Sequence, residues 1–203
     1  MKLYDAGPAP NPRRVRIFLA EKGITVPLVP VDLAKGEHRS DAYTALNPFQ
    51  RTPTLELDDG TAITESIAIC RYFEELQPDP PLFGTGALGR AQVEMWQRRL
   101  ELEFYAAVQA VFRHTHPAMA AMEVPQLPDW AAANRPRVEA FLRLLDRHLA
   151  DRPFVCGDAF TVADITGLVT LDFMRWARLA VPDDLAAVRG WHERLKARPS
   201  AQA

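Results

Sequence analysis

Hydrophobic and polar positions in the N-terminal part of the chain alternate between strand and helix periods. Residues 2–4 predict a short strand, and the loop 7–12, which holds three prolines, ends it. Asn11 is a favoured helix N-cap, and apolar residues then recur at helical spacing up to Gly23, a typical C-terminal stop. Residues 26–32 alternate as a second strand does, and the helical connection would place it parallel to the first.

A second group of elements follows the first. The pattern predicts a strand within 47–57, a tight turn at 58–60, a short strand at 61–64 and a helix from 65 to about 76. The order of elements is therefore β-α-β and then β-β-α. This order is typical of a compact mixed α/β module.

The pattern becomes helical after a proline-rich break at 77–81. Residues 92–111 form one long amphipathic segment and residues 138–149 another. The start of the second helix is open, because Pro136 allows either a start near Asp129 with a kink or a start at Arg135.

A capping box gives the sharpest local signal of the C-terminal part. Thr161 is predicted to cap a helix in which Asp164 is the third residue, with Phe160 and Ile165 as a hydrophobic staple. The segment 191–199 predicts a last amphipathic helix that ends at its proline. Both features are structural.

Charge and composition exclude several classes of function. The chain has 24 Lys and Arg against 26 Asp and Glu, a balance that disfavours nucleic-acid and anionic-membrane partners. The N-terminus lacks the apolar core of a signal peptide and no run is suited to span a bilayer, which predicts a cytoplasmic protein. The 2 cysteines, Cys70 and Cys156, lie far apart and lack metal-ligand spacing, so neither a disulfide scaffold nor a metal site is expected.

Several separated motifs together resemble the cytosolic glutathione S-transferase family over essentially the whole chain. They are Asn47-Pro48 followed by Thr52-Pro53, Glu65-Ser66 at a helix start, the Gly157 to Asp164 block, and the Trp191 to Pro199 tail. The resemblance implies a thioredoxin-like α/β domain at 1–77, a linker at 78–87 and an all-helical domain at 88–203. It also implies an enzyme that uses glutathione as co-substrate, and no metal.

The resemblance implies a glutathione site around Thr52. A cis Thr52-Pro53 bond would turn the Thr52 amide and carbonyl toward the cysteine residue of glutathione, as in strand addition. The alternative is that Pro53 only edges a strand. The helix start at Ser66 suits the γ-glutamyl carboxylate, and Glu65 would receive the ammonium group, although both residues are also ordinary capping choices.

At the other end of the ligand, Arg51 and His38 resemble family residues near the glycine carboxylate. Both would otherwise be solvated surface residues.

The catalytic position departs from the commoner family patterns. The family places a Ser, Cys or Tyr near the end of the first strand, where a hydrogen bond favours the thiolate. Here Ala9 stands where nu-class-like bacterial members carry threonine, and Asn11 is the remaining donor, unless its side chain only caps the helix. Arg14 would add positive potential beside it or lie as a solvated residue, and Tyr4 is a reserve candidate better suited to the core.

The resemblance further implies an apolar electrophile site between the domains and a dimer. The residues expected to line or close that site are Tyr105, Phe112, Arg113, His116 and Trp176. Phe49, apolar on a loop, resembles the dimer key of the family, which predicts a homodimer.

Three functions fit these features. The first is a glutathione transferase that stabilises the thiolate and transfers it to a small apolar electrophile. The second is a glutathione-dependent disulfide-bond reductase or peroxidase, and the third is a non-catalytic binding or scaffold protein of the same fold.

Overall fold

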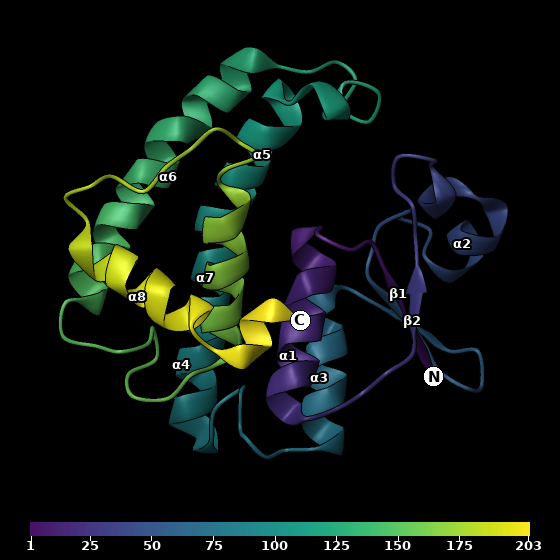
Figure 1. Ribbon diagram of the computed structural model, residues 1–203, viewed down its shortest axis with the longest axis horizontal. Coiled ribbons are helices and arrows are strands. Elements are labelled where there is room, and N and C mark those ends of the chain that lie inside the picture. The colour runs from purple at the N-terminus through teal and green to yellow at the C-terminus, as the bar shows by residue number, and fades with distance from the viewer. The chain divides into compact units, whose positions relative to one another are not determined.

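A computed structural model describes residues 1–203 as two compact units. The first comprises Met1–Leu82 together with Pro199–Ala203, and the second comprises Phe83–Arg198 (Figure 1). The sequence-based division places the last residues in the helical domain, whereas here they group with the N-terminal unit. The backbone carbonyl of Ala201 accepts a hydrogen bond from Arg13 Nη2 at 3.0 Å, which accounts for part of this grouping.

The N-terminal unit contains a four-stranded sheet in the order β2-β1-β3-β4. The strands are β1 (Lys2–Asp5), β2 (Leu28–Pro30), β3 (Thr54–Glu56) and β4 (Ala62–Thr64). β1 and β2 are parallel, with Leu3 opposite Leu28, and β3 runs antiparallel to both of its neighbours. This topology confirms the predicted β-α-β, β-β-α order, although β2 is shorter than the sequence pattern suggests.

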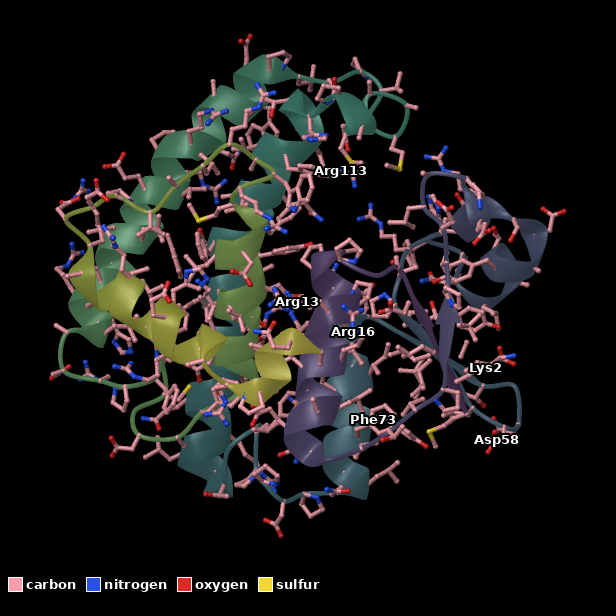
Figure 2. All side chains as sticks on the ribbon, viewed as in Figure 1. Lys2, Arg13, Arg16, Asp58, Phe73 and Arg113 are labelled. Atoms are coloured by element: carbon pink, nitrogen blue, oxygen red, sulfur yellow. The ribbon has the colours of Figure 1, made fainter.

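Helices cover both faces of this sheet. α1 (Pro10–Lys22) and α3 (Ser66–Leu76) pack side by side on one face, and α2 (Asp41–Leu46) lies on the other, preceded by the short turn η1 (Glu37–Arg39) (Figure 1). Arg13 and Arg16 project from α1, and Phe73 from α3 (Figure 2). Phe73 is buried in the core of this unit, which anchors α3 through its apolar face.

The start of α1 differs from the sequence-based expectation. Asn11 was expected to cap the helix, but the helix begins at Pro10, and Ala9 occupies the N-cap position without a side-chain hydrogen bond. Proline is favoured at the first helical position because its fixed φ suits the helix and its missing N–H is not needed there. Asn11 therefore lies within the first turn, where its side chain is not a cap.

The end of α1 is fixed by a buried lysine. Gly23 terminates the helix in the left-handed conformation, as predicted. The ammonium group of Lys22 donates to the carbonyls of Gln77 at 2.8 Å and Pro78 at 3.2 Å, and pairs with Glu74 at 2.6 Å. These bonds satisfy backbone carbonyls just after α3 and hold the proline-rich break.

The C-terminal unit is all-helical, as predicted. It contains α4 (Gly86–Arg99), the π-helical turn η2 (Leu100–Tyr105), α5 (Ala106–Thr115), the turn η3 (Pro117–Met119), α6 (Pro128–Leu149), α7 (Val162–Phe173) and α8 (Ala186–Lys196). The final turn η4 (Pro199–Gln202) belongs to the first unit, where it packs on α1. None of the helices combines the length and apolar character needed to cross a membrane.

α7 forms the centre of the helical unit. Its residues from Val162 to Leu171 are all buried, and it packs against α4, η2 and α8. The predicted capping box at its start is present, with Thr161 at the N-cap and Asp164 as the third helical residue. α6 starts at Pro128 and continues through Pro136, which confirms the earlier of the two predicted starts to within one residue.

Candidate functional site

The loop ahead of α1 is fixed by one carboxylate and one guanidinium. Asp5, at the end of β1, accepts a hydrogen bond from the Gly7 amide at 2.8 Å and pairs with Arg16. Arg16 also donates from Nη2 to the Gly7 carbonyl at 2.9 Å. Gly7 has a φ of 56°, a conformation that glycine adopts without steric cost. The chain therefore enters the first turn of α1 in a defined direction.

A buried arginine joins the first turns of α1 and α3. Arg14 is 1% exposed, so the alternative of a solvated side chain is wrong. Its Nη1 donates to Asn11 Oδ1 at 2.9 Å and to Ser66 Oγ at 2.6 Å. One side chain thus holds two residues to which the resemblance assigns different parts of glutathione, Asn11 for the thiol and Ser66 for the γ-glutamyl carboxylate.

These two bonds decide which way the polar groups of Asn11 and Ser66 point. A guanidinium can only donate, so the oxygen of the Asn11 carboxamide faces Arg14 and the amide nitrogen faces away from it. That amide nitrogen has no acceptor within the chain. The Ser66 oxygen likewise accepts from Arg14, which leaves its hydroxyl proton free to donate elsewhere.

Glu65 precedes α3 in an unusual backbone conformation. Its φ is 65° and its ψ is 117°, a region that side-chain-bearing residues rarely adopt. Its side chain makes no capping hydrogen bond, so the role of a simple N-cap is not observed. Strained residues of this kind gather at binding sites, where the surrounding structure enforces them.

The segment before Pro53 is held by side chains from α2 and its end. The Thr52-Pro53 peptide is cis, as predicted. Tyr43 donates its hydroxyl to the Arg51 carbonyl at 2.7 Å, and the Asn47 side-chain amide donates to the same oxygen at 2.7 Å. The sequence did not indicate the role of Tyr43, which depends on a fold contact eight residues along the chain.

His38 and Arg51 differ in their surroundings. His38 is 6% exposed, so the surface alternative is wrong for this residue, and its buried Nδ1 has no hydrogen-bond partner. Burial lowers the pKa of His38 below its ordinary 6.5, which keeps the ring neutral at pH 7. Arg51 is exposed.

Other nucleophile and donor candidates in the N-terminal unit are occupied or inert. Tyr4 donates its hydroxyl to Glu56 at 2.8 Å, and burial raises the pKa of Tyr4 above its ordinary 10.0. Burial also raises the pKa of the Cys70 thiol to about 12 and that of Cys156, in the helical unit, to about 11. Neither cysteine is a ready thiolate at neutral pH.

The helical unit gathers aromatic side chains from α5, η2 and α7. The ring centroid of Phe112 lies 4.8 Å from that of His116 and 4.9 Å from that of Phe173. The Tyr105 ring centroid lies 6.1 Å from that of Phe173, and the Trp176 ring centroid lies 6.3 Å from that of His116. The structure therefore brings together four of the five residues predicted for the electrophile site. Phe173 joins them, although the sequence analysis did not single it out.

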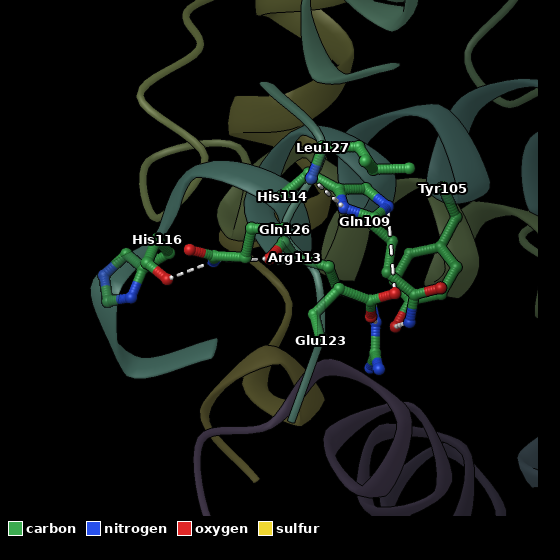
Figure 3. A network of polar contacts seen from close by, with 8 residues as sticks. All are labelled: Tyr105, Gln109, Arg113, His114, His116, Glu123, Gln126 and Leu127. Atoms are coloured by element: carbon green, nitrogen blue, oxygen red, sulfur yellow. Dashed lines mark hydrogen bonds and ion pairs between the residues drawn. The ribbon is translucent and has the colours of Figure 1, made fainter. Parts of the chain in front are cut away.

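Arg113, the fifth predicted residue, belongs to a polar network that also includes Tyr105 and His116 (Figure 3). Its guanidinium forms an ion pair with Glu123, whose other oxygen lies 3.8 Å from His114 Nε2. Gln126 donates from Nε2 to the carbonyls of Arg113 at 2.8 Å and His116 at 3.0 Å. The network ties residues 116–127, hereafter the strap, to the end of α5.

Comparison with known proteins agrees with this architecture. The family model "Glutathione S-transferase, N-terminal domain" matches residues 9–76, and the model "Glutathione S-transferase, C-terminal domain" matches residues 128–194. Glutathione S-transferase 2 of Saccharomyces cerevisiae is 38% identical over 205 residues, which cover 100% of this chain and 88% of the yeast protein. Glutathione S-transferase 3 of Zea mays is 34% identical, over 100% of this chain and 91% of the maize protein.

Solved structures show the same similarity over the full length. A glutathione S-transferase domain-containing protein of Marinobacter aquaeolei VT8 is 41% identical with a TM-score of 0.95, covering 99% of this chain and 100% of that one. Gtt2 from Saccharomyces cerevisiae is 38% identical with a TM-score of 0.94, covering 100% of this chain and 99% of that one. On these matches, the chain belongs to the glutathione S-transferase family.

Proposed function

We propose that this glutathione S-transferase stabilises the thiolate of bound glutathione with the side-chain amide of Asn11. The observation that carries the proposal is the Asn11–Arg14 hydrogen bond, which fixes the amide oxygen on Arg14 and leaves the N–H groups without an acceptor in the chain. A donor that has no internal partner can serve a negatively charged ligand atom. Tyr4 and the two cysteines are unsuited to this role for the reasons given above.

The chemistry needs only a donor at the sulfur atom. A free cysteine thiol has a pKa of ~8.5. The bound thiol gives its proton to solvent, and a hydrogen bond to the resulting thiolate raises the reactive fraction at neutral pH. The sulfur then supplies the electron pair of a new C–S bond, and the leaving group departs with the pair of the bond that breaks. Where the electrophile is an addition acceptor, a proton from solvent completes the product.

The N-terminal unit offers groups for the rest of the tripeptide. Ser66 and the free amides at the start of α3 would hold the γ-glutamyl carboxylate, and Glu65 its ammonium group. The amide and carbonyl of Thr52, next to Pro53, take no hydrogen bond within the chain and would pair with the cysteine residue.

For the glycine carboxylate we propose Arg51 and His38. Arg51 offers an exposed positive charge, and the ring of His38 a neutral polar group.

The helical unit supplies an apolar surface for the electrophile. Tyr105, Phe112, His116 and Trp176 belong to one connected aromatic cluster. The charge of Arg113 is offset by Glu123, so it does not favour an anionic substrate. We therefore propose a small apolar electrophile, with aromatic stacking as the main attraction.

We further propose that the protein forms a homodimer. Phe49 is 72% exposed on its loop, and Leu88, Met95 and Leu102 are exposed at seven-residue spacing along α4 and η2. Large apolar side chains in such a regular row favour contact with another chain. Gel filtration of Phe49→Ser and Met95→Glu should show monomers. A dimer that persists in both variants would count against these assignments.

Binding and activity measurements test the enzyme proposal. Wild type and Asn11→Ala should bind S-methylglutathione with similar affinity, because Asn11 faces the sulfur atom and this ligand has no ionisable thiol. Conjugation to an aromatic halide should fall at least about tenfold in the variant. A parallel assay with a hydroperoxide and a small disulfide separates transferase from reductase or peroxidase activity. Equal conjugation rates in wild type and Asn11→Ala would overturn the proposed role of Asn11.

A further inference from the structure

We propose that Arg14 is a positioning residue that aims two glutathione donors at once, the amide of Asn11 toward the sulfur and the hydroxyl of Ser66 toward the γ-glutamyl carboxylate. The inference rests on the proposed function and assigns a role to a residue that does not itself touch the ligand. Asn11 and Ser66 lie on different helices, and Arg14 donates to both.

The geometry of Arg14 suits this task. The residue is 1% exposed, and it lies one helical turn after Asn11 on α1. Its Nη1 is shared between Asn11 Oδ1 at 2.9 Å and Ser66 Oγ at 2.6 Å. A guanidinium is planar and permanently protonated, so it offers donors in fixed directions and never an acceptor.

The consequence for Asn11 concerns the two ends of its carboxamide. The oxygen and nitrogen ends are nearly equal in size, and a free carboxamide would present either one to the ligand. An oxygen turned toward a thiolate would repel it, whereas the N–H groups stabilise it. The Arg14 contact allows only the orientation in which the N–H groups of Asn11 face the ligand, because the reverse would turn them toward the N–H donors of Arg14.

The consequence for Ser66 concerns the direction of its proton. A hydroxyl can accept and donate at the same time. Since the oxygen accepts from Arg14, the proton must point to another partner, and the start of α3 is where a carboxylate would bind. Loss of Arg14 should therefore weaken the contacts to the sulfur and to the γ-glutamyl carboxylate together.

Two measurements on a small set of variants test the proposal. Affinity for S-methylglutathione, which has no ionisable thiol, reports the γ-glutamyl end, and thiolate absorbance of bound glutathione against pH reports the sulfur end. The variants are Arg14→Met, Arg14→Lys, Asn11→Ala and Ser66→Ala. Arg71→Gln, which removes an exposed arginine from α3, serves as the matched control.

Arg14→Met should combine two losses that the other variants show singly. We expect about a three- to tenfold weaker S-methylglutathione affinity, as in Ser66→Ala, and a raised thiol pKa of bound glutathione, as in Asn11→Ala. Arg14→Lys should recover part of both, since it keeps a buried cationic donor. Adding Asn11→Ala to Arg14→Met should change the thiol pKa less than Asn11→Ala does alone.

Two results would overturn the inference. One is a folded Arg14→Met variant that matches wild type in both measurements. The other comes from Asn11→Asp, which keeps an acceptor for Arg14 but has no N–H donor. This variant tests the inference even if Arg14→Met does not fold. It should fold, bind S-methylglutathione as wild type does and raise the thiol pKa. A thiol pKa that is raised in Asn11→Ala but unchanged in Asn11→Asp contradicts the proposed orientation.

Failure of the proposed function would look different. In that case wild type would not bind glutathione, would bind it with an ordinary thiol pKa, or would share a lowered thiol pKa with Asn11→Ala. A wild type that lowers the thiol pKa, together with insensitivity to Arg14, would overturn only the role of Arg14.

Discussion

The indole of Trp191 occupies the space that a side chain at position 167 would fill. A methyl group on Gly167 would lie 2.1 Å from Trp191 Cη2, far inside van der Waals contact. Trp191 is buried, and its Nε1 donates to Asp164 at 3.0 Å, so the ring cannot easily move aside. α7 and α8 therefore depend on a glycine in the middle of a buried helix.

Gly167→Ala should destabilise the protein by about 2 kcal/mol or more, because the added methyl overpacks this contact. Gly190→Ala is the matched control, since position 190 also lies within a helix but a methyl there meets nothing within 4 Å. That control should stabilise the protein by about 0.5–1 kcal/mol. Urea unfolding of both variants measures the difference. Equal stabilities would mean that the Trp191 ring adapts to the extra methyl.

The buried carboxylate of Asp164 gives a prediction about pH. It accepts hydrogen bonds from the backbone of Val155 and Thr161, from the Thr161 hydroxyl and from Trp191, but burial raises its pKa from 3.8 to about 6. The folded state thus holds this proton more tightly than the unfolded chain does. This tighter proton binding stabilises the folded state fully below the unfolded pKa. The stabilisation is lost as the pH rises through the folded pKa of about 6.

Asp164→Asn removes that titration. It should also cost roughly 3 kcal/mol at pH 7, because its NH2 group would face N–H donors. The stability of wild type minus that of the variant should fall by at most about 1.4 kcal/mol per pH unit between about pH 4 and 6, then level off. Urea unfolding at several pH values measures the difference. A difference that grows with pH across this window would contradict the raised pKa.

The strap should open when Glu123 is lost. Glu123→Ala frees Arg113 and His114 from their carboxylate partner (Figure 3). The strap then keeps only its hydrogen bonds from Gln126 and from the amides of Leu127 and His116 to α5. Cleavage of the strap by a non-specific protease should become about five- to tenfold faster, since cleavage follows the population of the open form.

Glu103→Ala is the control for this experiment, because it removes an exposed ion pair, that with Arg137. It should cleave at the wild-type rate. Equal cleavage of Glu123→Ala and wild type would show that the strap does not depend on Glu123.

Local sequence signals predicted the fold well. The Thr161–Asp164 capping box, the Gly23 stop and the βαβ order depend on residues close in sequence, and the structure confirms all three. Local signals for the start of a helix were less reliable where two residues both suit a position in its first turn. Pro10 takes the first helical position, and this displaces Asn11 from the cap.

The candidate site was harder to derive because its polar groups meet across the fold. The sequence left Arg14 either as a source of positive potential beside Asn11 or as a solvated residue, and did not indicate its partner Ser66, which lies 52 residues away. No periodicity signals such a contact. Tyr43, Phe173 and the π-helical turn at Leu100–Tyr105 were missed for the same reason, since each is defined by its packing.

Thiolate absorbance of bound glutathione, titrated against pH in wild type and Asn11→Asp, tests the central claim most directly. Asn11→Asp preserves the contact to Arg14 and removes only the proposed donor. The account predicts a thiol pKa well below ~8.5 in wild type and a return to at least that value in the variant. An equally low thiol pKa in both proteins would contradict stabilisation of the thiolate by Asn11.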